Sequence, residues 1–498
     1  MNGRSGTPAG GGLGGPYDVL ILGGGVVGSA IARRLSRHRL RIALVEREAE
    51  VGFGTSKTNS GIIHPGHDTS LDTLKGRLVV AGNAAFDRLS EELSFAFRRI
   101  GQLNVARTEE ELETLRRLKA QGDAKGVPGL ELWDATRLRR EEPNLSRHLV
   151  GALHAPSAGV INPYEFAFAL VESARRNGVE LLVDSPVLGI DAVGERLAVR
   201  VPAGVLEARF VLNATGVQAD LVSRMVGVDD FEIRPRKGEE YMLDKRLMGL
   251  VRHLVFPLPT GTTKGTLIIP TWDGTIMVGP TAEDVRDRDD VATTAEGAEA
   301  VFSAVRALCP AIDPRDAITA FAGLRAVSST NDFVIGPTKV KGFVNVAGIQ
   351  SPGLTAAPSI AEHVEGILAR EGLALEPRPG YEPRVAGPTR FARLPPERQE
   401  ALAARDPRFA RVVCRCELVT EAEIHEAIDH GAVTLDGLKF RCRAGMGRCQ
   451  GGFCTSRAME ILAERLGKPI HEVTKRGAGS WVALPMPDAG EVPGGGPR

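Results

Sequence analysis

One stretch near the start of the chain, residues 17–46, constrains the fold more than any other. A continuous apolar run, as expected of a parallel strand buried on both faces, is followed by glycines in G-x-G-x-x-G spacing and a helix-like pattern. A second apolar run then ends at Glu46, 23 residues after the first glycine. The first glycine permits a tight turn, the second lets amides approach a pyrophosphate, the third allows close helix–strand packing, and the carboxylate accepts from ribose hydroxyls. The stretch therefore predicts a Rossmann-like βαβ unit that binds a dinucleotide through Gly23, Gly25, Gly28 and Glu46, with a glycine-rich loop that binds nothing as the alternative.

Chain length and charge balance limit the classes of protein to which the chain can belong. The chain has 498 residues, enough for two or three domains, with 62 basic and 62 acidic residues and 5% aromatics, which argues against a nucleic-acid binder. Residues 1–16 are Gly-rich without an apolar core and are expected to be a disordered leader. No apolar run reaches the roughly 18 residues that span a bilayer. We expect a cytoplasmic protein, with contact to the inner face of the membrane only through a partner.

Three further segments carry a resemblance. "GFGTSKTNSGIIHPGHD" (52–68), "ARFVLNATGVQAD" (208–220) and "GFVNVAGIQSPGLTAAPSIAEHV" (342–364) occur in the order seen in the D-amino-acid-oxidase-like flavoproteins, which the chain resembles over residues 17–372. The resemblance favours FAD over NAD. It implies an α/β fold: a Rossmann-like domain with a parallel sheet, and an antiparallel-sheet substrate domain built from insertions at about 76–150 and 230–320. It also implies flavin contacts by Thr55, Ser56, Asn59, Ser60, Ala214, Thr215, Gly216, Gly348, Gly353, Leu354 and Thr355.

The same resemblance implies the catalytic residues. His64 lies in the loop expected beside the flavin ring, as proton acceptor or flavin-orienting residue, and a histidine satisfied by local backbone is the alternative. Arg325 matches the G-x-R position that binds the substrate anion in the family. A purely structural ion pair is the alternative role for this arginine. Lys264 and the segment 233–241 are secondary candidates, and "PRKGE" in that segment could equally be a solvated hairpin. His67 and Asp68 are expected on the pocket wall.

Five of the six cysteines lie between 414 and 454. Residues 373–408 are rich in Pro, Gly and Arg and predict a linker to a small, mostly helical domain at 409–470, followed by a tail at 471–498. Cys414 and Cys416 form C-x-C, and Cys449 and Cys454 form C-x₄-C, with 32 residues between the pairs. Four thiolates can bind zinc or an iron–sulfur cluster, and C-x-C is uncommon at zinc sites. "RAGMGRCQGGFC" resembles the [2Fe-2S] domain of bacterioferritin-associated ferredoxin, which implies a [2Fe-2S] cluster on those four cysteines, with Cys442 a bystander and Cys309 a core residue.

The combination resembles the A subunit of anaerobic glycerol-3-phosphate dehydrogenase. This implies an FAD-dependent dehydrogenase that oxidises a small anionic secondary alcohol and passes electrons through the cluster to a quinone or a partner redox subunit in a hetero-oligomer. The arginine that those enzymes place soon after the loop histidine is absent, and "NSGIIHPG" also resembles L-2-hydroxyglutarate oxidases, so that hydroxy acid is the alternative substrate. A structural or redox-sensing cluster is the alternative to a relay. A reductase fed by NAD(P)H is disfavoured, since no second G-x-G-x-x-G follows a strand.

Overall fold

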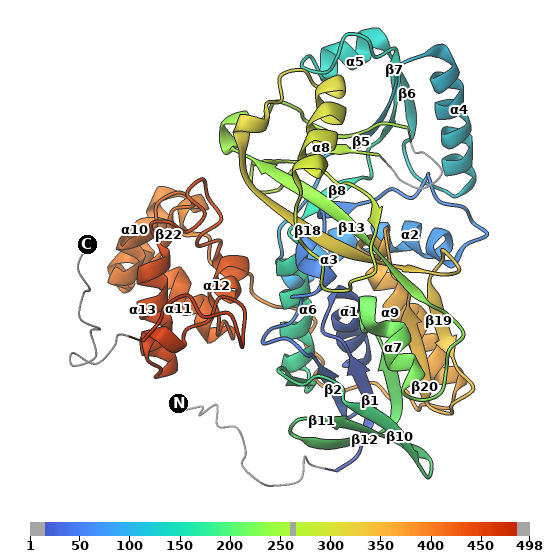
Figure 1. Cartoon of the computed structure of the whole chain (residues 1–498), viewed down its shortest axis with the longest axis vertical. Helices are drawn as coiled ribbons and strands as arrows, with labels where there is room; N and C mark the ends of the chain where they lie inside the picture. Colours follow the sequence, from blue (N-terminus) through green and yellow to red (C-terminus); the bar gives the residue numbers. More distant parts are fainter. Residues whose placement is uncertain (1–14, 259–264, 486–498) are drawn as a thin grey trace, which may run out of the picture. The chain divides into compact units, whose positions relative to one another are not determined.

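The computed structural model describes residues 15–258 and 265–485. The chain divides into two compact units, Met1–Gly387 and Pro388–Arg498. Figure 1 shows the sheets and helices of both units. In the part of the chain that the structure describes, no helix is both long and apolar enough to cross a membrane.

The first unit is built on an eight-stranded sheet whose parallel centre runs β20–β12–β1–β2–β9. The strands β10, β11 and β19 extend it in antiparallel fashion. This sheet comprises β1 (Tyr17–Leu22), β2 (Ile42–Val45), β9 (Glu180–Leu182), β10 (Gly189–Val193), β11 (Arg196–Val201), β12 (Gly204–Asn213), β19 (Val334–Pro337) and β20 (Phe343–Ala347).

Strand β1 is buried on both faces, as its continuous apolar run predicts. Val19 and Ile21 join one hydrophobic cluster, in which they lie with residues of several helices, and Leu20 and Leu22 join another, with β11 and β12. Three helices of the first cluster are α1 (Val26–Leu35), α6 (Pro163–Arg176) and α9 (Gly353–Arg370), and α1 packs against the other two. The first unit therefore has the predicted Rossmann-like, mixed α/β architecture.

A second sheet of nine strands is mainly antiparallel and combines both predicted insertions. Its long central pair, β13 and β18, places Arg236 opposite Arg325 and Glu240 opposite Phe321. The strands are β5 (Gln102–Ala106), β6 (Glu131–Asp134), β7 (Gly151–Ala155), β13 (Ile233–Leu243), β14 (Leu254–Phe256), β15 (Leu267–Pro270), β16 (Ile276–Gly279), β17 (Glu283–Asp284) and β18 (Ala317–Ser328). The helices α4 (Glu109–Ala124), α5 (Ala135–Glu141) and α8 (Ala295–Leu308) contact this sheet.

A small third sheet and several short helices complete the first unit. The strands β3 (Ile62–Ile63), β8 (Gly159–Ile161) and β4 (Phe97–Arg99) pair antiparallel, so the loop that carries His64 leaves directly from a strand. The remaining helices of this unit are α2 (Leu74–Ala84), α3 (Phe86–Leu93) and α7 (Ala219–Arg224).

Residues 373–408, expected to be a linker, make defined contacts in the structure. Up to Gly387 the segment belongs to the first unit: Val385 is buried and its amide donates to the Glu92 carbonyl, and Arg378 donates to the Ser36 and Leu40 carbonyls. From Pro388 the chain belongs to the second unit and forms α10 (Pro396–Arg405). The Pro- and Gly-rich composition did not reveal these contacts, because an irregular segment can be anchored by backbone hydrogen bonds as firmly as a helix.

The second unit is a small, mostly helical domain with its own apolar core. The core contains Val413, Ile424, Leu438, Ile461 and Leu462. Around it lie a two-stranded sheet, β21 (Val412–Cys414) and β22 (Val419–Thr420), and the helices α11 (Glu421–Asp429), α12 (Leu435–Cys442) and α13 (Thr455–Leu466). Thr420 and Glu423 form the capping box of α11 that T-x-x-E predicts.

Candidate active site and cysteine cluster

A cavity of about 970 Å³ in the first unit begins where β1 ends. Gly23 and Gly25 line it, and α1 starts at Val26, so the amino end of that helix faces the cavity. Gly23 has φ +104°, and a Cβ there would collide with the Ala214 carbonyl. Gly28 does not line the cavity, and a Cβ on it would meet the Gly23 carbonyl. Gly23 therefore suits the tight turn, Gly25 lies where an amide can approach a ligand in the cavity, and Gly28 lets helix and strand approach.

Glu46 lies at the end of β2 on the cavity wall. Its Oε2 accepts from the Gly24 amide at 2.7 Å and its Oε1 from the Glu48 amide at 3.0 Å. Burial raises the pKa of the carboxyl above its ordinary value, and these two amides partly oppose that shift. A fixed acceptor beside the glycine turn is the chemistry that a dinucleotide ribose requires.

The loop 54–60 closes the cavity beside α1. Ser56 Oγ accepts from the Val26 amide at 2.9 Å, and Thr55 Oγ1 donates to the Leu324 carbonyl of β18 at 2.8 Å. Asn59 Oδ1 accepts from the Gly61 amide at 2.7 Å. All three side chains line the cavity, so the loop joins the dinucleotide end to the second sheet.

Most of the other predicted cofactor residues line the cavity, and two of them lie behind its wall. Lining residues are Ala214, Thr215, Gly216, Gly353, Leu354 and, from the loop, Ser60. Gly348 and Thr355 do not line the cavity: Gly348 has φ +67°, and Thr355 is fully buried beneath His64. The residues present fit a dinucleotide cofactor, since glycines, amides and a carboxylate meet at one end of a single cavity.

His64 follows β3 and lines the same cavity. Its amide donates to Thr355 Oγ1 at 2.9 Å, and its carbonyl accepts from Asn83 Nδ2 at 2.9 Å, so its backbone is fixed from both sides. The ring stands edge-on to Phe256, with centroids 6.1 Å apart, and Nε2 is 3.4 Å from Ser351 Oγ. A fixed imidazole that faces a cavity can accept a proton.

The two candidates that follow His64 on the same loop, His67 and Asp68, differ in whether they line the cavity. Asp68 lines the cavity, whereas His67 is fully buried behind it and its Nε2 lies 2.9 Å from Asn104 Oδ1. Lys264, the third catalytic candidate, lies outside the described residues.

Arg325 extends from β18 into the cavity, opposite Arg236. Within the described residues its guanidinium donates only long hydrogen bonds, of 3.3 and 3.4 Å, to the Thr281 carbonyl. Burial lowers its pKa, which the nearby Glu240 carboxylate partly offsets. A Cβ on Gly238 would stand 2.5 Å from Nη2 of Arg325, so that glycine makes the space the guanidinium occupies. The arrangement offers a planar cationic fork to an anion.

The segment 233–241 is the long strand β13 rather than a solvated hairpin. Lys237, Glu239 and Glu240 are at most 4% exposed. Charged residues on a strand look solvated in a sequence, because each buried partner comes from a distant segment: Asp290 for Lys237, Thr294 for Glu239, and Ser60 for Glu240. Sequence reasoning therefore missed Glu240 as a cavity residue, and the period-two pattern of Arg234, Arg236 and Gly238 was the available signal.

In the second unit the four predicted ligands lie close together. Hydrogen bonds link the thiols in two pairs, Cys414 with Cys454 and Cys416 with Cys449. The bond to Cys454 lowers the pKa of Cys414, and amides of Gly445, Glu417 and Cys416 lower it further. Such amides toward sulfur are the surroundings of an iron–sulfur cluster. The four thiols are a donor set that would hold a [2Fe-2S] cluster.

Cys442 and Cys309 stand apart from this set. Cys442 is buried, its Sγ donates to the Leu438 carbonyl at 3.1 Å, and burial raises the pKa of its thiol to about 12. Cys309 is fully buried in the core of the second sheet. Both positions suit the predicted bystander and core roles.

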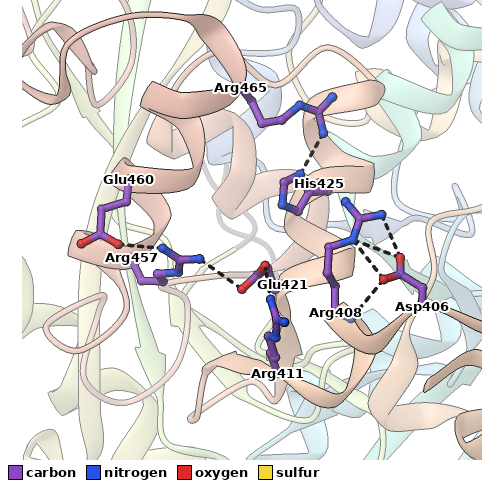
Figure 2. A network of polar contacts seen from close by, with 8 residues as sticks. All are labelled: Asp406, Arg408, Arg411, Glu421, His425, Arg457, Glu460 and Arg465. Atoms are coloured by element: carbon purple, nitrogen blue, oxygen red, sulfur yellow. Dashed lines mark hydrogen bonds and ion pairs between the residues drawn. The ribbon is translucent and has the colours of Figure 1, made fainter. Parts of the chain in front are cut away.

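Arginines tie together the helices that carry the cysteine loops (Figure 2). Arg457 of α13 bridges Glu421 of α11 and Glu460, and Arg411 reaches Glu421 from the other side. Arg465, two turns later on α13, pairs with Asp429 and His425 of α11. The first turn of α13 follows Cys454 directly, so these contacts hold the end of the cysteine loop.

Comparison with known proteins agrees with both units. The FAD dependent oxidoreductase family matches residues 18–366, and the BFD-like [2Fe-2S] binding domain matches residues 412–464. A glycerol 3-phosphate dehydrogenase of Caloramator mitchellensis is 40% identical over 479 residues, covering 96% of this chain and 100% of that protein. The anaerobic glycerol-3-phosphate dehydrogenase subunit A1 of Haloferax volcanii is 27% identical, over 89% of this chain and 82% of its own.

A solved structure gives the same result for the first unit. The dithionite-reduced L-alpha-glycerophosphate oxidase of Mycoplasma pneumoniae with FAD bound superimposes with a TM-score of 0.71 at 29% identity, covering 74% of this chain and 98% of that one. The resemblances drawn from the sequence, the fold class and both cofactors are thereby confirmed. The chain belongs to the FAD dependent oxidoreductase family and, with its BFD-like [2Fe-2S] binding domain, is an oxidoreductase whose cofactors are FAD and a [2Fe-2S] cluster.

Proposed function

We propose that the chain oxidises glycerol 3-phosphate to dihydroxyacetone phosphate and passes the electrons through its [2Fe-2S] cluster to a quinone or a partner redox subunit. The observation that carries the substrate is the half-buried guanidinium of Arg325 in the same cavity as the dinucleotide pocket. The relatives named as acting on glycerol 3-phosphate support it, one of them over nearly the whole chain.

In this proposal Arg325 binds the phosphate. Its hydrogen bonds to Thr281 are long and therefore weak, so the fork can turn to oxygen atoms of a dianion at little cost. Gly238 leaves the space in which it turns.

His64 accepts the proton of the substrate's secondary hydroxyl. Thr355 and Asn83 hold its backbone, and Phe256 limits rotation of its ring, so Nε2 stays toward the cavity. When bound, FAD would supply the acceptor for the hydride of carbon 2; with the hydroxyl proton taken by His64, oxidation of the alcohol removes two electrons and two protons in all. The surrounding wall of β13 and β18 shields the reacting carbon from water.

Glu46, Gly23 and Gly25 would hold the cofactor's ribose and pyrophosphate, and Cys414, Cys416, Cys449 and Cys454 would hold the cluster. The cluster accepts electrons singly, which suits a partner subunit, as the likeness to an A1 subunit suggests. A cytoplasmic enzyme that reaches the inner face of the membrane through that partner follows from this proposal.

Anaerobic reduction of the flavin tests the substrate. The full-length holoenzyme is mixed with glycerol 3-phosphate, L-2-hydroxyglutarate or one of several amino acids, and the flavin absorption is followed without oxygen. Rapid bleaching by glycerol 3-phosphate alone is expected. Bleaching only by L-2-hydroxyglutarate or an amino acid would contradict the proposal.

A further inference from the structure

A carboxylate lies in the cavity wall without a role in the mechanism above. Glu240 is 2% exposed, and its side chain lines the cavity together with those of Ser60, His64 and Arg325. It occupies β13 two residues beyond Gly238, on the strand face that carries the cavity residues.

Half of this carboxylate has no hydrogen-bond partner. Oε1 accepts from Ser60 Oγ, but Oε2 is buried with no donor within reach among the described residues. A buried acceptor left without a donor is costly, and a donor brought by a ligand removes that cost.

The adjacent Glu239 differs, because both of its carboxylate oxygens accept hydrogen bonds. Glu239 points to the other face, where its carboxylate accepts from Tyr241 Oη at 2.9 Å and from the Thr294 amide and hydroxyl at 2.8 and 2.9 Å. Every oxygen of Glu239 therefore serves the fold, whereas Oε2 of Glu240 has no such partner among the described residues.

We propose that Glu240 determines substrate specificity: its Oε2 accepts a hydrogen bond from a hydroxyl of a polyol phosphate and excludes ligands that place a carboxylate at the same point. The inference rests on the proposed function, since Arg325 is taken to hold the phosphate. A hydroxyl donates to a buried carboxylate, whereas a second carboxylate cannot and adds like-charge repulsion. Glu240 would thus separate glycerol 3-phosphate from 3-phosphoglycerate, and disfavour L-2-hydroxyglutarate.

The charge of Glu240 depends on pH in the range where the enzyme would work. Burial raises its pKa to about 7, and the hydrogen bond from Ser60 and the charge of Arg325 oppose that shift. Other titratable or charged residues that line the same cavity include His64, Asp68 and Arg236, whereas Phe321 lies opposite Glu240 on β18 and Gly279 of β16 packs on its Cα and Cγ. Exclusion of a carboxylate should therefore weaken below pH 7, where Glu240 is neutral.

The test compares two ligands that differ at one carbon. Glycerol 3-phosphate and the 3-phosphoglycerate of the same spatial configuration at carbon 2 differ only in CH₂OH against COO⁻. With full-length holoenzyme at equal flavin content, anaerobic flavin reduction gives kcat/KM for the first, and the perturbation of flavin absorption gives Kd for the second and for inorganic phosphate.

In Glu240→Gln we expect kcat/KM for glycerol 3-phosphate to fall at least tenfold and 3-phosphoglycerate to bind at least tenfold more tightly, with Kd for inorganic phosphate within twofold. Glu240→Asp, which retains the carboxylate, should keep the wild-type preference. The preference of the wild type for glycerol 3-phosphate over 3-phosphoglycerate should also decline below pH 7. The preference of Glu240→Gln should not change with pH.

An unchanged ratio between the two ligands in Glu240→Gln, or an equal loss of both, would overturn the inference. Failure of glycerol 3-phosphate to reduce the wild-type flavin would contradict the proposed function instead. In that case the Kd ratio of the two ligands, measured without turnover, still decides the role of Glu240.

Discussion

Gly238 controls the position of Arg325 without touching a substrate. A Cβ there would lie within 2.9 Å of Nη2, Nη1 and Cζ of Arg325, which form the movable end of a side chain and not backbone. We therefore expect Gly238→Ala to fold with FAD but to displace the guanidinium. Loss of a charged hydrogen-bonded contact of about 1.5–3 kcal/mol predicts kcat/KM lower by roughly 10- to 150-fold, mainly through KM.

The matched control is Arg325→Lys, which keeps the charge but not the fork, and should show a similar rise in KM. Flavin content and the urea midpoint distinguish this effect from misfolding. A wild-type KM in Gly238→Ala would mean that Arg325 does not bind the substrate anion.

Glu240 also makes a prediction about stability. Its pKa rises from 4.5 to about 7 on folding, so between these values the folded chain binds more protons than the unfolded chain. The free energy of unfolding then decreases as pH rises through this window, by about 3 kcal/mol for a shift of this size. Glu240→Gln lacks this contribution.

Urea unfolding of both proteins at pH 5 and pH 8 measures it. The stability of Glu240→Gln relative to wild type should increase from the lower to the higher pH. A difference that is constant over this range would show that Glu240 ionises as it does in the unfolded chain.

The cysteine loop depends on close approach of two backbone segments more than on the surface ion pairs of Figure 2. A Cβ on Gly447 would collide with Cβ of Cys416. Gly447→Ala should therefore lose at least half of its cluster, measured as iron per protein and as visible absorption.

Arg457→Ala is the control on the same helix bundle. Arg457 and Glu460 are half exposed whereas Glu421 is largely buried, and a pair with one exposed partner contributes about 1 kcal/mol or less. The variant should keep its iron and lose little stability. Equal iron loss in both variants would show that the arginine ties, and not the glycine, shape the loop.

The elements that could be predicted are those whose signal is local. The glycine spacing, β1 and the capping box of α11 are each written within a few dozen residues, and the structure has all of them. Strand β13 and the anchoring of 373–387 could not be predicted in this way. Glu240 becomes a cavity residue only because Ser60 and Arg325 approach from 180 residues before and 85 residues after it.

At the scale of the whole chain, the two units separate two chemical tasks. The cavity belongs to residues before 387 and the four paired cysteines to residues after 388. If the cluster relays electrons, Cys416→Ser with Cys449→Ser should leave anaerobic flavin reduction by glycerol 3-phosphate within twofold of wild type. Turnover with a one-electron acceptor of the quinone type should slow at least tenfold.

Freeze-quench EPR of the wild type supplies the second measurement. The reduced cluster signal should appear no later than one turnover after substrate is added. A cluster that stays oxidised while the flavin is reduced would favour a structural or sensing role.

The anchoring of residues 373–387 has a kinetic consequence. Val385 is bound to the first unit and the amide of Thr389 to Glu426 of the second, so the covalent connection that is left between these anchors is only a few residues long. A short tether keeps each unit at a high effective concentration around the other, in the millimolar range or above. Electron exchange between the two cofactors of one chain should therefore be first-order, with a rate constant that does not change when the protein is diluted.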